Sequence, residues 1–204
     1  MKDKSTFRAG PDNPTFAEHR RRLDTRTALV TIAGGLVVAG VAAMAFIYSG
    51  IYDVAAITPD NAMVAWAIHL ASDRSIAARD GDIQVPTNLN KPEILSAGGM
   101  LFSQNCAVCH SGPGMHQTDI SQGLNPQPPN LFATGRKPEM NEAFWFIKNG
   151  VKMTAMPGFA KSQTDEQIWA LAAFVGKAPG MSASDFADQT GLKASALDNK
   201  QSGG

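Results

Sequence analysis

Two cysteines and a histidine form the most distinctive chemical motif of the sequence. Cys106 and Cys109 are the only cysteines among the 204 residues, and His110 follows directly in the run Cys106-Ala107-Val108-Cys109-His110. This C-x-x-C-H pattern is typical of c-type haem attachment, in which two thiols form thioethers with the haem vinyl groups and the imidazole ligates the iron. About one helical turn can present both sulfurs to one edge of a porphyrin. The motif therefore predicts one covalently bound haem c.

Two other kinds of site use a C-x-x-C pair. A zinc site needs four ligands, and without a second C-x-x-C the pair would depend on His110, His116 or a carboxylate. A thioredoxin-like redox site needs a βαβ setting, which the helical pattern of this chain does not supply. We therefore favour haem attachment and keep these two sites as alternatives.

Three amphipathic helices and one long loop are expected to position the motif. A helix start at Asn90-Lys91-Pro92-Glu93, with Asn90 as the N-cap, precedes an apolar face that leads into Cys106. Residues 141–150 predict a second helix with Asn141 as its N-cap, and Thr164-Asp165-Glu166-Gln167 is a capping box that begins a third, ending at Gly176. Prolines and glycines interrupt residues 111–140. The sequence predicts an all-α haem domain over residues 90–177.

An uncharged apolar segment precedes this domain. No charged residue occurs from Thr27 to Tyr52, and about 20 apolar residues suffice for a helix to cross a bilayer. Four arginines lie within residues 20–26, and no Lys or Arg follows the segment until Arg74. The positive-inside rule then places the N-terminus in the cytoplasm. The alternative is a cleaved signal peptide, with Ala43-Met44-Ala45 as a small-x-small cleavage pattern.

These patterns divide the chain into five parts. We expect a cytoplasmic tail over residues 1–26, a single transmembrane helix over 27–52, a periplasmic helix and linker over 53–89, the haem domain over 90–177, and a flexible tail over 178–204. Pro59-Asp60-Asn61 can begin the helix in the third part, to which the sequence assigns no role. This organisation predicts a single-pass membrane protein, and the family resemblance given below implies that the membrane is a bacterial inner membrane.

The haem domain resembles the class I cytochrome c family, and in particular its bacterial membrane-anchored monohaem members. The resemblance covers roughly residues 90–177 and rests on the following marks in order: Gly98 and Phe102, the C-x-x-C-H motif, Pro129-Asn130-Leu131, Trp145 with Lys148-Asn149-Gly150, Met156-Pro157, and Trp169, Leu171 and Phe174 in the last helix. It implies that Gly98, Phe102, Leu171 and Phe174 form the crossing of the first and last helices of the domain. Of these marks, only C-x-x-C-H is specific by itself.

The resemblance also implies the roles of the remaining site residues. It places the second iron ligand at Met156, so that His110 and Met156 would be the metal ligands; Met153 and His116 are the alternatives. The Pro129 carbonyl is the expected acceptor for the free NH of His110. Leu131, Trp145 and Phe159 are expected to pack against the porphyrin. Together with Cys106 and Cys109, these residues make up the predicted cofactor site.

Iron with both axial positions filled suits electron transfer more than catalysis. We therefore predict an electron carrier without an enzymatic reaction of its own, which passes single electrons from a respiratory or dehydrogenase donor to an acceptor such as a terminal oxidase. The partners would be redox proteins of a membrane respiratory complex or a dehydrogenase. The alternative is a haem enzyme or gas sensor with a labile sixth ligand. The formal net charge is zero, which gives no support for nucleic-acid binding.

Overall fold

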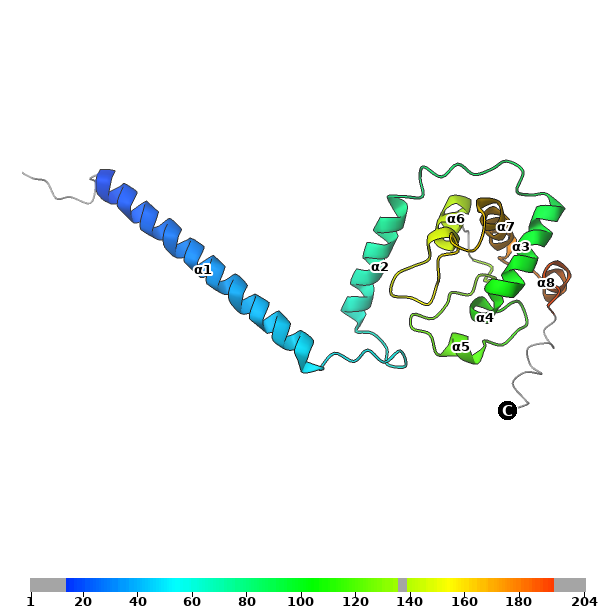
Figure 1. The fold of residues 1–204 in the computed structure, drawn as a ribbon, viewed down its shortest axis with the longest axis horizontal. Helices are drawn as coiled ribbons and strands as arrows, with labels where there is room; N and C mark the ends of the chain where they lie inside the picture. The colour runs from blue at the N-terminus through cyan, green and yellow to red at the C-terminus, as the bar shows by residue number, and fades with distance from the viewer. Residues whose placement is uncertain (1–13, 136–138, 193–204) are drawn as a thin grey trace, which may run out of the picture. The chain divides into compact units, whose positions relative to one another are not determined.

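The computed structural model describes the backbone of residues 14–135 and 139–192, and side chains from Asp24 onward. All regular elements in these ranges are helices, as predicted (Figure 1). They are α1 (Pro14–Ser49), α2 (Ala62–Ala77), α3 (Pro92–Asn105), α4 (Ala107–His110), α5 (Asp119–Gln122), α6 (Met140–Asn149), α7 (Asp165–Lys177) and α8 (Ala183–Thr190). The chain divides into two compact units, Met1–Val54 and Ala55–Gly204. Each unit is described by itself.

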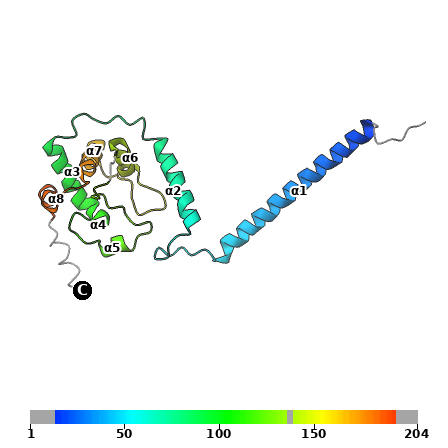
Figure 2. The same ribbon diagram turned by 180° about the vertical axis from the view of Figure 1, so that it is seen from behind.

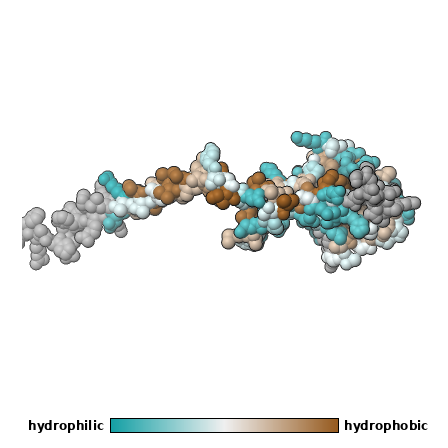
Figure 3. Space-filling view, turned by 90° about the horizontal axis from the view of Figure 1, so that it is seen from below, coloured by the Kyte–Doolittle hydropathy of each residue, from teal (hydrophilic) through white to brown (hydrophobic). Residues whose placement is uncertain are grey.

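The first unit contains one long apolar helix. Residues Asp24–Ser49 of α1 form a span of 26 residues with a mean hydropathy of 2.3, long and apolar enough to cross a membrane. Hydrophobic side chains cover this part of α1 (Figure 3). The predicted boundaries are wrong at both ends, because the helix already includes residues 14–26 and stops at Ser49. Gly50 adopts a positive φ of 66°, which ends the helix. Residues 1–13 of the predicted tail lie outside the described range.

The second unit begins with the predicted periplasmic helix, α2. Asn61 is its N-cap, with the side-chain oxygen accepting a hydrogen bond from the Met63 N–H at 2.9 Å. The opposite end is attached to the haem domain, where Ile76 is buried and the Asn141 side chain donates to the Asp80 carbonyl at 3.1 Å. Both ribbon views place α2 and α8 on opposite sides of the helices of this unit (Figures 1 and 2).

The core of the haem domain is the crossing of α3 and α7, as expected from the sequence. Phe102, Leu171 and Phe174 are fully buried there. At Gly98 the helices approach so closely that a Cβ atom would lie 2.1 Å from the carbonyl oxygen of Ala170. Only glycine permits this approach. The end of α3 leads directly into the Cys106–His110 turn, so the crossing fixes the position of the haem-binding motif.

The caps of these helices only partly match the sequence-based predictions. The capping box of α7 is confirmed, with Thr164 and Gln167 bonded reciprocally. The residue before α3 is Lys91 rather than Asn90. Pro92 occupies the first helical turn, where the backbone N–H that proline lacks would have no partner within the helix. Glu139 rather than Asn141 precedes α6. In the described part of the predicted irregular stretch 111–140, residues Asp119–Gln122 form the short helix α5 and Met140 begins α6. Helix α7 ends at Lys177 rather than Gly176.

The predicted flexible tail over residues 178–204 is wrong for its first part. α8 is capped by the Ser182 side chain and ended by Gly191 in the left-handed conformation. Its Phe186 is buried and meets the rings of Phe102, Phe132 and Phe174 at centroid distances between 5.3 and 6.4 Å. Phe186 is the one large apolar side chain of α8, and one such residue makes too weak a pattern to predict a docked helix. Residues 193–204 lie outside the described range.

Candidate haem site

The haem-attachment motif forms one tight helical turn at the end of α3. The Cys106 N–H still donates to the Phe102 carbonyl at 2.9 Å, and the Cys106 carbonyl accepts from the N–H groups of Cys109 and His110 at 3.0 and 2.9 Å. Both thiols are free and partly exposed. Two sulfur atoms and the following imidazole therefore come from one rigid turn, as haem attachment requires.

Burial governs the protonation of Cys106. Burial raises the pKa of the Cys106 thiol to about 12, and the nearby Cys109 adds to the increase. In the polypeptide without haem the thiol therefore carries its proton at neutral pH. Zinc binds cysteine as the thiolate. Within the described ranges no group of three or more His, Cys, Asp or Glu residues is arranged to hold a metal ion. Within the part of the chain that the structure describes, the cysteine pair therefore lacks the further ligands that a zinc site needs.

Two hydroxyl groups that the sequence analysis did not single out support this turn. Thr118 donates its side-chain O–H to the Val108 carbonyl, and the fully buried Ser121 donates to the Cys109 carbonyl at 2.8 Å. These carbonyls belong to the last residues of a short helix and lack partners within it. Thr118 is also the N-cap of α5. In the sequence, the only sign of this cap is that Thr118 precedes the acidic residue Asp119 in a loop. That pattern does not indicate that the hydroxyl contacts the Val108 carbonyl.

The His110 ring lies next to the proline-rich loop. Its Nδ1 atom is 3.0 Å from the Pro129 carbonyl oxygen, the acceptor that the family resemblance implied. With this nitrogen protonated, the ring donates to Pro129, and Nε2 is the ring nitrogen that would carry the lone pair for a metal. A small hollow of about 100 Å³ adjoins the ring and is lined by Cys109, Met115 and Pro128 among others. A larger hollow of about 310 Å³, lined by Leu95, Lys177 and Gln189 among others, contains no residue of the motif.

Met156 lies in a closely bonded loop between α6 and α7. Its carbonyl accepts from the Val151 N–H at 3.1 Å, and its N–H donates to the Thr154 hydroxyl at 3.1 Å. The Thr154 hydroxyl in turn donates to the Val151 carbonyl at 2.8 Å. The Met156 side chain is partly buried and packs against the hydrophobic core. These hydrogen bonds hold the backbone around the predicted sulfur ligand.

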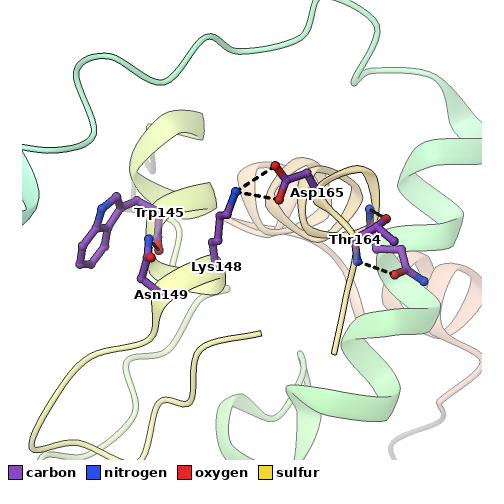
Figure 4. Close-up of polar contacts among 6 residues, drawn as sticks. Trp145, Lys148, Asn149, Thr164 and Asp165 are labelled. Carbon is purple, nitrogen blue, oxygen red and sulfur yellow. Dashed lines mark hydrogen bonds and ion pairs between the residues drawn. The ribbon is translucent and has the colours of Figure 1, made fainter. Parts of the chain in front are cut away.

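Contacts between α6 and the returning chain fix the ends of this loop. The N–H groups of Phe159 and Ala160 donate to the carbonyls of Ile147 and Lys148, each at 3.0 Å. Lys148 also extends from α6 to the start of α7, where its Nζ lies 2.8 and 2.9 Å from the two carboxylate oxygens of Asp165 (Figure 4). The loop therefore starts and finishes at the same place in the fold.

Two glycines allow the two ends of the loop to touch. Gly150 ends α6 with a φ of 66°, and a Cβ atom on it would lie 2.5 Å from the Gly158 nitrogen. A Cβ atom on Gly158 would lie 2.6 Å from the Asn149 carbonyl oxygen. Both contacts are with backbone, which cannot rotate away as a side chain can. The end of the predicted helix 141–150 at Gly150 is confirmed, but nothing in the local pattern indicated this packing.

The other predicted site residues differ in how deeply they are buried. Leu131 and Phe159 are partly buried and pack against it, as Met156 does. Trp145 is partly exposed, meets the Phe146 ring edge-to-face at 6.0 Å and points away from the Lys148–Asp165 pair (Figure 4). Met153, one of the two alternatives to Met156, is 78% exposed and adopts a positive φ of 59°. His116, the other alternative, is exposed and lies in the loop that follows the motif.

The donor set suits a haem c. Two thiols and an imidazole stand on one turn, a thioether lies on a second, independently held loop, and partly buried apolar side chains accompany both.

A family model described as "Cytochrome C oxidase, cbb3-type, subunit III" matches residues 94–175, the segment from α3 to α7. This domain belongs to the class I cytochrome c family. It is accordingly a haem-binding electron-transfer domain. No curated protein matches the chain.

The matched segment includes every predicted haem-contacting residue of this cytochrome. It excludes α1, α2 and α8. The cytochrome domain of this chain is therefore extended at its C-terminus by α8, which packs on α3 through the close contact of Gly99 with the Gln189 backbone. Such a contact makes α8 part of the same folded unit.

Proposed function

We propose that this protein is a membrane-anchored monohaem c-type cytochrome that carries single electrons. Cys106 and Cys109 would hold the haem through thioethers, and His110 and Met156 would be the axial ligands. The observation that carries the proposal is the pairing of a rigid C-x-x-C-H turn with an independently bonded methionine loop in a class I cytochrome c domain. When bound, the haem supplies an iron that changes its charge by one electron.

The side chains around the haem would hold this iron in one coordination state. The Pro129 carbonyl orients the His110 ring and favours the tautomer in which Nε2 carries the lone pair that would coordinate the iron. The hydrogen bonds around Met156 hold its backbone in place, so that little rearrangement would accompany a change of charge at the iron. Leu131 and Phe159 limit the access of water, which favours a higher reduction potential together with the methionine sulfur.

Membrane attachment would restrict this carrier to partners at one surface. The apolar span of α1 and the four arginines before its apolar part support an anchor with a cytoplasmic N-terminus and a periplasmic haem domain. The donor would then be a respiratory or dehydrogenase complex, and the acceptor a protein such as a terminal oxidase. Intact-mass analysis of the mature protein tests the anchor, because cleavage near Ala45 would remove most of α1. Purification in a mild detergent would identify the partner that remains bound.

Replacement of the two neighbouring methionines tests the ligand assignment. In the Met156→Ala protein we expect the oxidised form to lose the sulfur-to-iron charge-transfer band and the reduced form to bind CO readily, because the sixth position becomes open. The Met153→Ala protein is the matched control, since Met153 is close in sequence but exposed. It should retain both the band and the resistance to CO.

The reverse result would assign the ligand to Met153. If the unmodified protein already lacks the band and binds CO, the sixth position is labile, and the domain is better described as a haem enzyme or gas sensor. Mass spectrometry of the Cys106→Ser and Cys109→Ser proteins tests the covalent bonds, because each variant should retain only one thioether.

A further inference from the structure

Helix α2 has two apolar faces, and only one of them is covered. Val64, Ala65 and Ile76 lie on the face that is half-buried or buried against the haem domain. Met63, Trp66 and Leu70 recur at intervals of three and four residues and occupy the opposite face of the helix. Met63 is 75%, Trp66 64% and Leu70 41% exposed, whereas the most exposed large apolar residue of the other face, Ile68, is 38% exposed. Soluble surfaces rarely present a tryptophan and a methionine together in this way without a partner.

The uncovered face has a fixed orientation with respect to the haem domain. Next to the C-terminal end of α2, the Asn141 side chain donates to the Asp80 carbonyl at 3.1 Å. Before its N-terminal end, the Asn125 side chain donates to the Thr58 carbonyl at 3.3 Å. Asn125 belongs to the loop after α5 and Asn141 to α6, so α2 is attached at both of its ends. Whatever binds the uncovered face therefore also orients the domain.

The exposed apolar residues continue along the chain toward the membrane-spanning helix. Ile51, Val54 and Ile57 are at least 77% exposed, and they lie in the segment that joins α1 to α2. Residues 50–61 separate the two helices. A segment of this length reaches at most about 40 Å when fully extended. A bilayer crossed by α1 is thus always within reach of α2, at a high effective concentration that no free partner would have.

We propose that the uncovered face of α2, formed by Met63, Trp66, Ala67 and Leu70, lies in the interfacial layer of the membrane. This inference rests on the proposed membrane anchor. Tryptophan is enriched where the headgroups meet the acyl chains, because its ring is apolar and its indole N–H needs a polar partner. Arg74 follows Leu70 by one turn on the same face, where its guanidinium can reach lipid phosphates. Because residues 50–61 keep α2 close to the bilayer, its binding to the membrane does not require many basic residues.

This attachment has a consequence for electron transfer. A haem domain fixed to the bilayer through α2 would keep one orientation relative to the membrane plane instead of rotating freely on its linker. Its partners would then meet the same edge of the domain at every encounter. Electron exchange would favour proteins embedded in the same membrane over soluble carriers.

Spin labels on the full-length protein in phospholipid nanodiscs test this proposal. The haem-loaded protein should have no free thiol, so single cysteines introduced as Ala67→Cys or Leu70→Cys can be labelled individually. We expect both labels to be several-fold more accessible to oxygen, relative to a water-soluble nickel chelate, than a label at Ser184→Cys on the exposed surface of α8. The further change Met63→Ser with Trp66→Ser should return the label at position 70 to the accessibility of position 184.

The other outcomes overturn the proposal in distinguishable ways. Nickel accessibility at positions 67 and 70 equal to that at 184 would show that the face is in water, and protection from both reagents would show that protein covers it. A label at Val37→Cys reports on α1 separately: if it is inaccessible to nickel while positions 67 and 70 are not, the anchor stands and the α2 inference fails. Label uptake by the unaltered protein would instead refute the proposed thioether attachment.

Discussion

Replacing Gly158 by alanine should detach the sulfur ligand without touching a haem-contacting side chain. The new Cβ atom would lie 2.6 Å from the Asn149 carbonyl oxygen, against the 3.4 Å or more of an ordinary van der Waals contact. The two backbone segments would have to separate by about 0.8 Å. The hydrogen bonds from Phe159 and Ala160 to α6, each 3.0 Å long, are next to this contact and would lengthen beyond the usual range.

The expected magnitude follows from the cost of overpacking. Inserting a methyl group into a closed contact costs about 1–3 kcal/mol. If the loop relieves this strain by moving Met156 away from the iron, the ratio of ligated to unligated protein falls by about 5- to 150-fold. We expect a weaker sulfur-to-iron charge-transfer band, a lower reduction potential and measurable CO binding by the reduced protein.

A matched glycine provides the control for this experiment. A Cβ atom added at Gly81 would meet no other atom within 4 Å, so Gly81→Ala should leave the spectrum and the potential unchanged. An unaltered charge-transfer band and potential in Gly158→Ala would refute the argument, because the contact between the two segments would then not determine the position of the ligand. Thermal unfolding of the same samples would separate loop displacement from general unfolding.

Three further changes probe the packing and capping of the domain. Gly98→Ala places a Cβ 2.1 Å from the Ala170 carbonyl oxygen and should cost at least about 3 kcal/mol, seen as a loss of holoprotein yield or a sharply lower Tm; a normal Tm would contradict the close helix crossing. Phe186→Ala should lower the free energy of unfolding by about 3–5 kcal/mol in chemical denaturation, and a change below about 1 kcal/mol would mean that α8 is not docked in solution. Thr164→Ala removes a helix cap and should cost about 0.5–2 kcal/mol. In the unaltered protein, hydrogen bonds from the backbone of Glu166 and from the Thr164 side chain lower the pKa of the Glu166 carboxyl. The stability that comes from this ionised carboxyl is therefore present above its unfolded-state pKa and is lost as the pH falls through its folded-state pKa. NMR titration of Thr164→Ala should show that pKa rising toward its ordinary value; an unchanged value would assign the shift to the backbone contact alone.

Several features of the fold were predictable because they depend on neighbouring residues. The capping box at Thr164, the helix end at Gly150 and a helix start within Pro59-Asp60-Asn61 each involve groups within about four residues of one another. The exact starts of α3 and α6 were not predictable in the same way, because nearby residues competed for each cap. The α3–α7 crossing was expected through the resemblance, but its 2.1 Å approach is a property of the packed helices.

By itself, the sequence determined the chemistry available to this protein. Two thiols and an imidazole within one short motif, and one uncharged apolar segment, are local patterns whose meaning does not depend on the rest of the fold. Only the tertiary structure brings the Pro129 carbonyl to His110, the Thr118 and Ser121 hydroxyls to the haem-binding turn, and α8 onto the core. These contacts join residues far apart in the chain or depend on one buried side chain, and such pairings follow from shape and packing, which local sequence patterns do not encode.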